Sequence, residues 1–210
     1  MNYRNAKKGI GQIYKAELLA ILGSVLLVVG AIVALVASNK GSEGGMVAGG
    51  IPALIGGILL IISYLINLVG LSNASKDDEY FKTAWIIALV TIVASAIQAV
   101  LNTKGLGIEW LFDLISRVGQ VAIMVFVITG IGRIADKLGN SNVSRLSKNT
   151  INVTCGVYIL ALIANLISDI FNAKAMMTVA AVIAIIAGIL SIISYIFYLR
   201  TLSQANQMFD

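Results

Sequence analysis

Six long apolar stretches follow one another along this chain, and they constrain its fold more than any other feature. Five of them contain no Asp, Glu, Lys or Arg, and the fourth contains only Asp113 and Arg117. An α-helix needs about 20 apolar residues to cross the roughly 30 Å hydrocarbon core of a bilayer. None of the stretches alternates with the period of two that a barrel strand requires. The stretches are 18–38, 47–70, 84–101, 110–132, 151–168 and 176–199.

Composition excludes a water-soluble fold. Of the 210 residues, 59% are apolar and only 12% are charged, about half the charged share of a soluble domain. A soluble domain of this length cannot bury that much apolar surface. We therefore predict an all-α polytopic membrane bundle of six transmembrane helices, with residues 1–210 forming a single integral membrane domain. The first stretch is too long for a signal-peptide apolar region, so we expect it to remain as a membrane helix.

Basic residues predict the orientation. With six crossings, both termini lie on one side, and the positive-inside rule makes the more basic side cytoplasmic. We therefore expect cytoplasmic N and C termini in a plasma membrane, and the compact loops favour a bacterial inner membrane. The net charge of +5 reflects this topology, so the lipid bilayer is the expected partner and nucleic acid is not. The opposite side has three lysines, and the predicted cytoplasmic side has Arg4, Lys7, Lys8, Lys15, Lys76, Lys82, Arg133, Lys137, Arg145, Lys148 and Arg200.

An internal repeat predicts tandem hairpins. Residues 57–74 and 188–205 are identical at 11 of 18 positions, including the Ser-Tyr pairs at 63–64 and 194–195. Short segments that each contain one lysine, at 39–41, 102–105 and 172–174, echo one another. We predict three two-helix hairpins as parallel repeats; chance similarity between Leu- and Ile-rich helices is the alternative. The longest connector is expected at 133–150, with its break at 139–142.

Small residues spaced by four predict two helix-packing faces. Such residues let two transmembrane backbones approach closely, which substitutes for the missing hydrophobic driving force in lipid. A second copy of the chain or another membrane protein is then a candidate partner. The two faces consist of Gly49, Ala53 and Gly57, and of Ala180, Ala184 and Gly188.

Polar residues in the apolar stretches leave two interpretations open. Asp113 and Arg117 are four residues apart on one helix face, and an ionisable residue inside a span is costly and often functional. One interpretation is an outward-facing polar pocket. The other is that Arg117 snorkels at the outer boundary and the remaining groups only bond between helices. The candidate pocket residues are Asp113, Arg117, Gln120, Gln98, Asn165 and Asp169.

The sequence has little that could carry catalysis. It has no histidine and one cysteine, Cys155, which excludes His-based metal sites and Ser-His or Cys-His catalysis. No phosphate-binding glycine loop occurs. We therefore predict no catalytic residues, no metal and no cofactor. Pro52, among glycines, is the one candidate for a broken membrane helix.

The layout of three two-helix repeats in about 200 residues resembles the six-helix acid-resistance membrane protein family of bacteria. That resemblance is architectural and implies the six-helix fold. From the residues, we predict a multi-pass membrane protein with a structural, stress-related or partner-binding role rather than an enzyme. The alternative is a transporter or channel for a small solute or ion.

Overall fold

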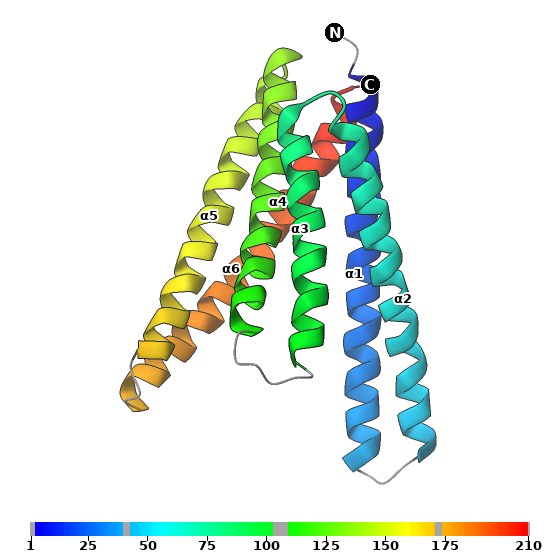
Figure 1. Cartoon of the computed structure of the whole chain (residues 1–210), viewed down its shortest axis with the longest axis vertical. Coiled ribbons are helices and arrows are strands. Elements are labelled where there is room, and N and C mark those ends of the chain that lie inside the picture. The colour runs from blue at the N-terminus through cyan, green and yellow to red at the C-terminus, as the bar shows by residue number, and fades with distance from the viewer. Residues whose placement is uncertain (1–2, 40–42, 103–108, 171–173, 210) are drawn as a thin grey trace. The chain divides into compact units, whose positions relative to one another are not determined.

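The structure, a computed structural model, describes residues 3–39, 43–102, 109–170 and 174–209 (Figure 1). Within these helices, the side chains of 43–46, 102, 109–110, 113, 162–170, 174–180 and 184 lie outside the description. All regular secondary structure described is α-helical. The helices are α1 (Arg4–Asn39), α2 (Glu43–Ala74), α3 (Glu79–Asn102), α4 (Glu109–Lys137), α5 (Ser141–Ile170) and α6 (Lys174–Gln207).

The helical fold class is confirmed. Five segments of the described helices are long and apolar enough to cross a membrane, and α5 is not among them. The number of crossings therefore stays a prediction. The five segments are Arg4–Asn39, Val47–Ala74, Glu79–Leu101, Leu114–Lys137 and Ala181–Gln207. The chain divides into two compact units, Met1–Ala74 and Ser75–Asp210, which are taken in turn.

In the first unit, α1 and α2 form an antiparallel pair along a seam of small residues. A methyl group added at Gly30 would lie 2.5 Å from the backbone nitrogen of Ala53. One added at Gly56 would lie 2.6 Å from the carbonyl oxygen of Gly23. Where a serine replaces glycine, Ser63 Oγ donates a hydrogen bond of 2.7 Å to the carbonyl oxygen of Ala16. The two backbones therefore run almost in contact.

The seam repeats every seven residues, a spacing that returns a side chain to the same face after two turns. This heptad pattern differs from the four-residue spacing that the sequence suggested. All eight of its members are buried. They are Gly9, Ala16, Gly23 and Gly30 on α1, and Gly49, Gly56, Ser63 and Gly70 on α2.

Carboxamide hydrogen bonds flank one end of this seam. Asn67 Nδ2 donates to Glu17 Oε1 over 3.0 Å, and Asn73 Nδ2 donates to Gln12 Oε1 over 2.7 Å. These bonds link the first half of α1 to the last turns of α2. They fix the same register as the glycine contacts, because each pairs residues that lie opposite one another in the antiparallel pair.

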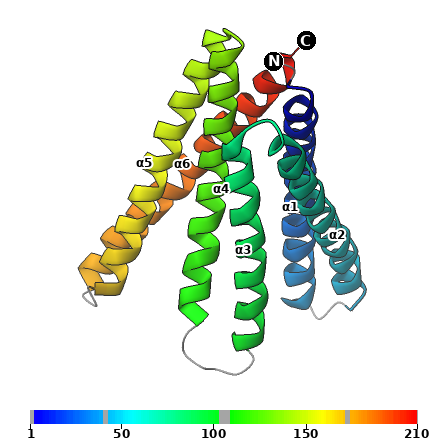
Figure 2. The same ribbon diagram turned by 45° about the horizontal axis from the view of Figure 1, so that its top comes forward.

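In the second unit, α3 and α4 also pack antiparallel. A methyl group added at Gly130 would lie 2.7 Å from the Phe81 ring, so this glycine leaves room for the aromatic side chain. Further along, the Ser95 and Ser116 hydroxyls are 3.0 Å apart and share a hydrogen bond. Helix α4 also contacts α5 and α6, which makes it the central helix of this unit (Figure 2).

Hydroxyl pairs join α5 to α6. The Thr150 and Thr201 hydroxyls are 2.9 Å apart, and so are those of Thr154 and Ser194. All four residues are buried. Thr150 and Thr201 can each also donate to a carbonyl of their own helix, that of Leu146 and that of Phe197. Because a buried hydroxyl without a partner is costly, the Thr154–Ser194 pair favours this register most directly.

One buried hydroxyl has no such partner. Ser147 of α5 is 1% exposed, and its Oγ forms no hydrogen bond among the described residues. It packs against α4, where a methyl group added at Gly132 would lie 3.1 Å from the Ser147 Cβ. Ser147 thus allows close packing without adding a hydrogen bond.

The internal repeat has a structural counterpart. Ser63 on α2 and Ser194 on α6 both form hydrogen bonds across a helix pair. Seven residues later, Gly70 contacts α1 and Thr201 bonds to α5. The equivalent positions of α2 and α6 therefore face their partner helices in the same register.

The connector between α4 and α5 corrects one expectation. A long loop over 133–150 is wrong, because only residues 138–140 separate the two helices. Gly139 adopts a φ of +72°, and the amide of Asn140 bonds to the carbonyl of Ala135 over 2.8 Å. This is the Schellman pattern that ends a helix. The Asn140 carboxamide then accepts from the Val143 amide over 3.1 Å and caps α5.

The predicted packing faces lie partly outside the described side chains. Gly49 contacts Ala34, and Ala53 contacts Gly30, both on α1. A methyl group at Gly57 would meet no atom within 4 Å, and the same is true at Gly188. The side chains of Ala180 and Ala184 lie outside the description. Helix α2 runs unbroken through Pro52, as membrane helices often do.

Two adjacent glycines give a matched test of the α1–α2 seam. Gly56→Ala should lower the free energy of unfolding by about 1–3 kcal/mol, because the added methyl overpacks the seam. Gly57→Ala should be neutral or stabilising by up to about 1 kcal/mol, since alanine is the better helix former. Thermal unfolding of the purified protein in detergent measures both. Equal effects of the two changes would contradict the seam.

The two buried serines make a second matched pair. Ser194→Ala should destabilise the protein by about 1 kcal/mol, because Thr154 loses its partner. Ser147→Ala should be neutral or stabilising by a similar amount, since it removes a buried hydroxyl without a partner among the described residues. The same unfolding measurement compares them, and a loss of stability in Ser147→Ala would show that this hydroxyl has a hydrogen-bond partner in the folded protein.

Candidate functional site

The structure describes only part of the predicted polar pocket. Arg117 and Gln120 are exposed on α4, whereas their neighbours Ser116 and Gly119 face α3. Gln98 is half-buried on α3. The side chains of Asp113, Asn165 and Asp169 lie outside the description. The pocket therefore stays a prediction.

An apolar groove of about 460 Å³ lies between α3 and α4. None of its described lining residues is charged, and the hydroxyl of Thr91 donates to the Ile87 carbonyl over 2.9 Å. Nothing in its described lining would recognise a polar solute. It is lined by Ile87, Val90, Thr91, Leu114, Ile115, Val118, Gly119 and Ala122.

An ion-pair cluster connects the start of α3 to the end of α4. Arg133 bonds to the carboxylate of Glu79, and its Nε lies 3.8 Å from Asp78 Oδ2. Its guanidinium carbon lies 5.5 Å from the centre of the Tyr80 ring. Asp78 also accepts from the Tyr80 amide over 2.9 Å, which caps α3. These contacts satisfy Arg133 within the fold, so the cluster acts as a structural clasp.

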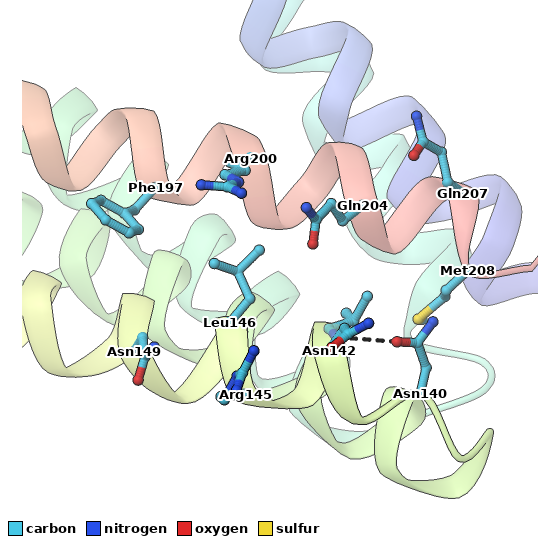
Figure 3. A pocket seen from close by; sticks show the side chains of 11 residues that line it. Asn140, Asn142, Arg145, Leu146, Asn149, Phe197, Arg200, Gln204, Gln207 and Met208 are labelled. Atoms are coloured by element: carbon cyan, nitrogen blue, oxygen red, sulfur yellow. Dashed lines mark hydrogen bonds between the residues drawn. The ribbon is translucent and has the colours of Figure 1, made fainter.

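A larger polar groove, of about 610 Å³, lies between the first turns of α5 and the last turns of α6. Figure 3 shows Leu146 of α5 and Gln204 of α6 in the space between the helices. Arg145 projects from α5, and Arg200 projects from α6. We call this the α5–α6 groove. It is lined by Asn140, Asn142, Val143, Arg145, Leu146, Asn149, Phe197, Arg200, Gln204, Gln207 and Met208.

The charged residues among the described lining of the α5–α6 groove are all positive. Two arginines and five carboxamides line it, and none of its described lining residues carries a carboxylate. Both arginines are exposed, and no ion pair is found for either within the described chain. The groove therefore offers positive charge and many hydrogen-bond donors to a ligand from outside.

Helical spacing builds the groove. Asn142, Arg145 and Asn149 follow one another at three and four residues on α5. Arg200, Gln204 and Gln207 do so at four and three residues on α6. Such spacings place side chains on one helix face. From the sequence alone both arginines are explained as markers of orientation, although their spacing from the carboxamides is already present in it.

The described residues hold no group of three or more His, Cys, Asp and Glu that could bind a metal ion. Cys155 is half-buried on α5. Comparisons with protein-family models, curated proteins and solved structures found no match to this chain. The resemblance to acid-resistance membrane proteins therefore stays a prediction.

Cysteine accessibility tests the predicted polar pocket. In a Cys155→Ser background, Asp113→Cys, Arg117→Cys and Val121→Cys would each be labelled by an impermeant thiol reagent in sealed right-side-out vesicles. An outward-facing cavity predicts labelling at all three positions, because water would follow the helix inward. Labelling that stops at 113 would mean that Arg117 lies at the boundary or is packed.

Proposed function

We propose that the chain is a multi-pass protein of the plasma membrane with a structural or partner-binding role and no catalytic activity. In this proposal it crosses a bacterial inner membrane six times as three hairpins. Both termini are cytoplasmic.

The observation that carries the role is how the helices use their polar groups. In the apolar segments, hydroxyls such as Ser63, Ser95 and Thr154 bond across helix pairs. The outward faces are apolar, and side chains such as Leu35, Leu54 and Ile192 are each 65% exposed. A surface of this kind suits lipid or other membrane helices. Few polar groups of the described segments are left to bind a solute.

The shared register of α2 and α6 supports the hairpin repeat. Ser63 and Ser194 are equivalent in the sequence repeat, and each bonds to the preceding helix. Helices α3 and α4 also pack antiparallel, so they form the middle hairpin of the proposed three. Three such hairpins return the chain to one side of the membrane each time, which agrees with the distribution of basic residues.

A transporter is the second candidate. It is favoured by Arg117, which is exposed within the membrane-spanning candidate Leu114–Lys137. A charged residue at such a place is often functional. The continuity of α2 through Pro52 argues against a transporter, because transport sites commonly use interrupted helices.

Single cysteines test the proposed topology. In a Cys155→Ser background, Asn39→Cys should react with an impermeant thiol reagent in right-side-out vesicles, because it follows the first crossing. Leu138→Cys should react only after permeabilisation, since it lies between α4 and α5. The reverse pattern would contradict the orientation, and equal labelling without permeabilisation would contradict the crossing.

A flux assay separates the two candidate roles. Purified protein in liposomes should release no more trapped ions or small solutes than protein-free liposomes under the structural proposal. A flux that Arg117→Ala or Asp113→Ala abolishes, in variants that unfold like the parent protein, would favour the transporter.

A further inference from the structure

The α5–α6 groove has the chemistry of a binding site for a phosphate group. Arginine presents several N–H donors in a fixed plane that matches phosphate oxygens, and such charge-assisted hydrogen bonds are strong. Arg145 and Arg200 stand on the two helices that form the groove. The carboxamides of Asn149 and Gln204 add neutral donors on the same two helices. Among the described lining residues, no carboxylate competes with an anion for these groups.

Arg133, the arginine of the ion-pair cluster, is not equivalent to this pair. Arg133 is bonded to Glu79 and lies near Asp78, so its charge is already neutralised within the fold. The opposed directions of α5 and α6 also matter, because the positive end of one helix dipole meets the negative end of the other. The attraction for an anion therefore comes from the arginine side chains.

Apolar surface adjoins the polar lining. Leu146 and Phe197, which also line the groove, are half-buried. Along α6, the neighbouring Ile192 and Ile196 are 65% and 58% exposed. A ligand with a charged head and apolar chains could place its head between the arginines and its chains along these isoleucines. A free phosphate ion would use only the polar part.

We propose that the α5–α6 groove binds the phosphate of an anionic phospholipid, with Arg145 and Arg200 as its charged ligands. This deepens the proposed function and rests on it, since a lipid headgroup reaches the groove only if this end of the bundle lies at a membrane surface. Bound lipid would hold the start of α5 to the end of α6, which no ion pair does among the described residues.

Ligand-induced stabilisation of the full-length protein in detergent tests the proposal. Three probes are titrated: a short-chain phosphatidylglycerol, a phosphatidylcholine of the same chain length, and glycerol phosphate. A ligand that binds only the folded protein raises the unfolding temperature with its concentration. We expect stabilisation by phosphatidylglycerol that salt weakens, and little by phosphatidylcholine.

Arg145→Gln with Arg200→Gln should weaken the apparent affinity for phosphatidylglycerol by about tenfold or more, because two charge-assisted contacts are lost. Arg4→Gln with Lys8→Gln changes the net charge equally at exposed positions outside the groove and should leave the affinity unchanged. Gln204→Leu keeps both charges and should weaken binding less, with Asn206→Leu as its control. This pair keeps the test usable if the double arginine variant fails to fold.

Unchanged phosphatidylglycerol affinity in the arginine variant, or in Gln204→Leu when only that variant folds, would overturn the proposal. Equal stabilisation by glycerol phosphate would overturn the lipid as the source of the phosphate. A failure of the proposed topology would be distinguishable from a failure of this proposal. The vesicle experiment tests the orientation of the chain in a membrane, whereas the titrations measure ligand binding to detergent-solubilised protein, which has no such orientation.

Discussion

Close contact between helix backbones is the interaction on which this structure depends. Apolar side chains gain little from leaving lipid for a neighbouring helix, so association must come from van der Waals packing and interhelical hydrogen bonds. Glycine brings backbones together, and the contacts of Gly30 with Gly49 and Ala53 leave no room for one more carbon atom. The large apolar side chains are then free to point outward, where many of them are exposed.

The helix pairs are held together by different chemistry. Glycines dominate between α1 and α2, and hydroxyl pairs dominate between α5 and α6. At the equivalent positions Gly70 and Thr201, one pair gains from shape alone and the other from a hydrogen bond. Interhelical hydrogen bonds in membranes contribute about 0.6–2 kcal/mol each. Packing and hydrogen bonding can therefore substitute for each other at one register.

The fold class could be predicted from the sequence because the length of an apolar run is set by the thickness of the bilayer. The seam was harder to predict. Four-residue spacing suggested Gly57, but the antiparallel pair follows a seven-residue repeat that selects Gly56. Each small residue of the seam packs against a residue of the opposite helix. The seam can therefore be recognised only when the sequences of α1 and α2 are compared with each other. The long loop expected over 133–150 failed because polar side chains were taken as loop, although they extend the helices beyond the apolar stretches.

The candidate site was missed for a related physical reason. Basic residues at helix ends follow from the positive-inside rule, so Arg133, Arg145 and Arg200 had the same explanation in the sequence. In the fold, these arginines differ in the residues that surround them. Arg133 meets acidic residues at the start of α3, far earlier in the chain, and its charge is used to clasp two helices. Arg145 and Arg200 line a groove together with carboxamides instead, which cannot neutralise them. An arginine that the charge bias alone would explain is thus available to a ligand only where the fold leaves it without an acid.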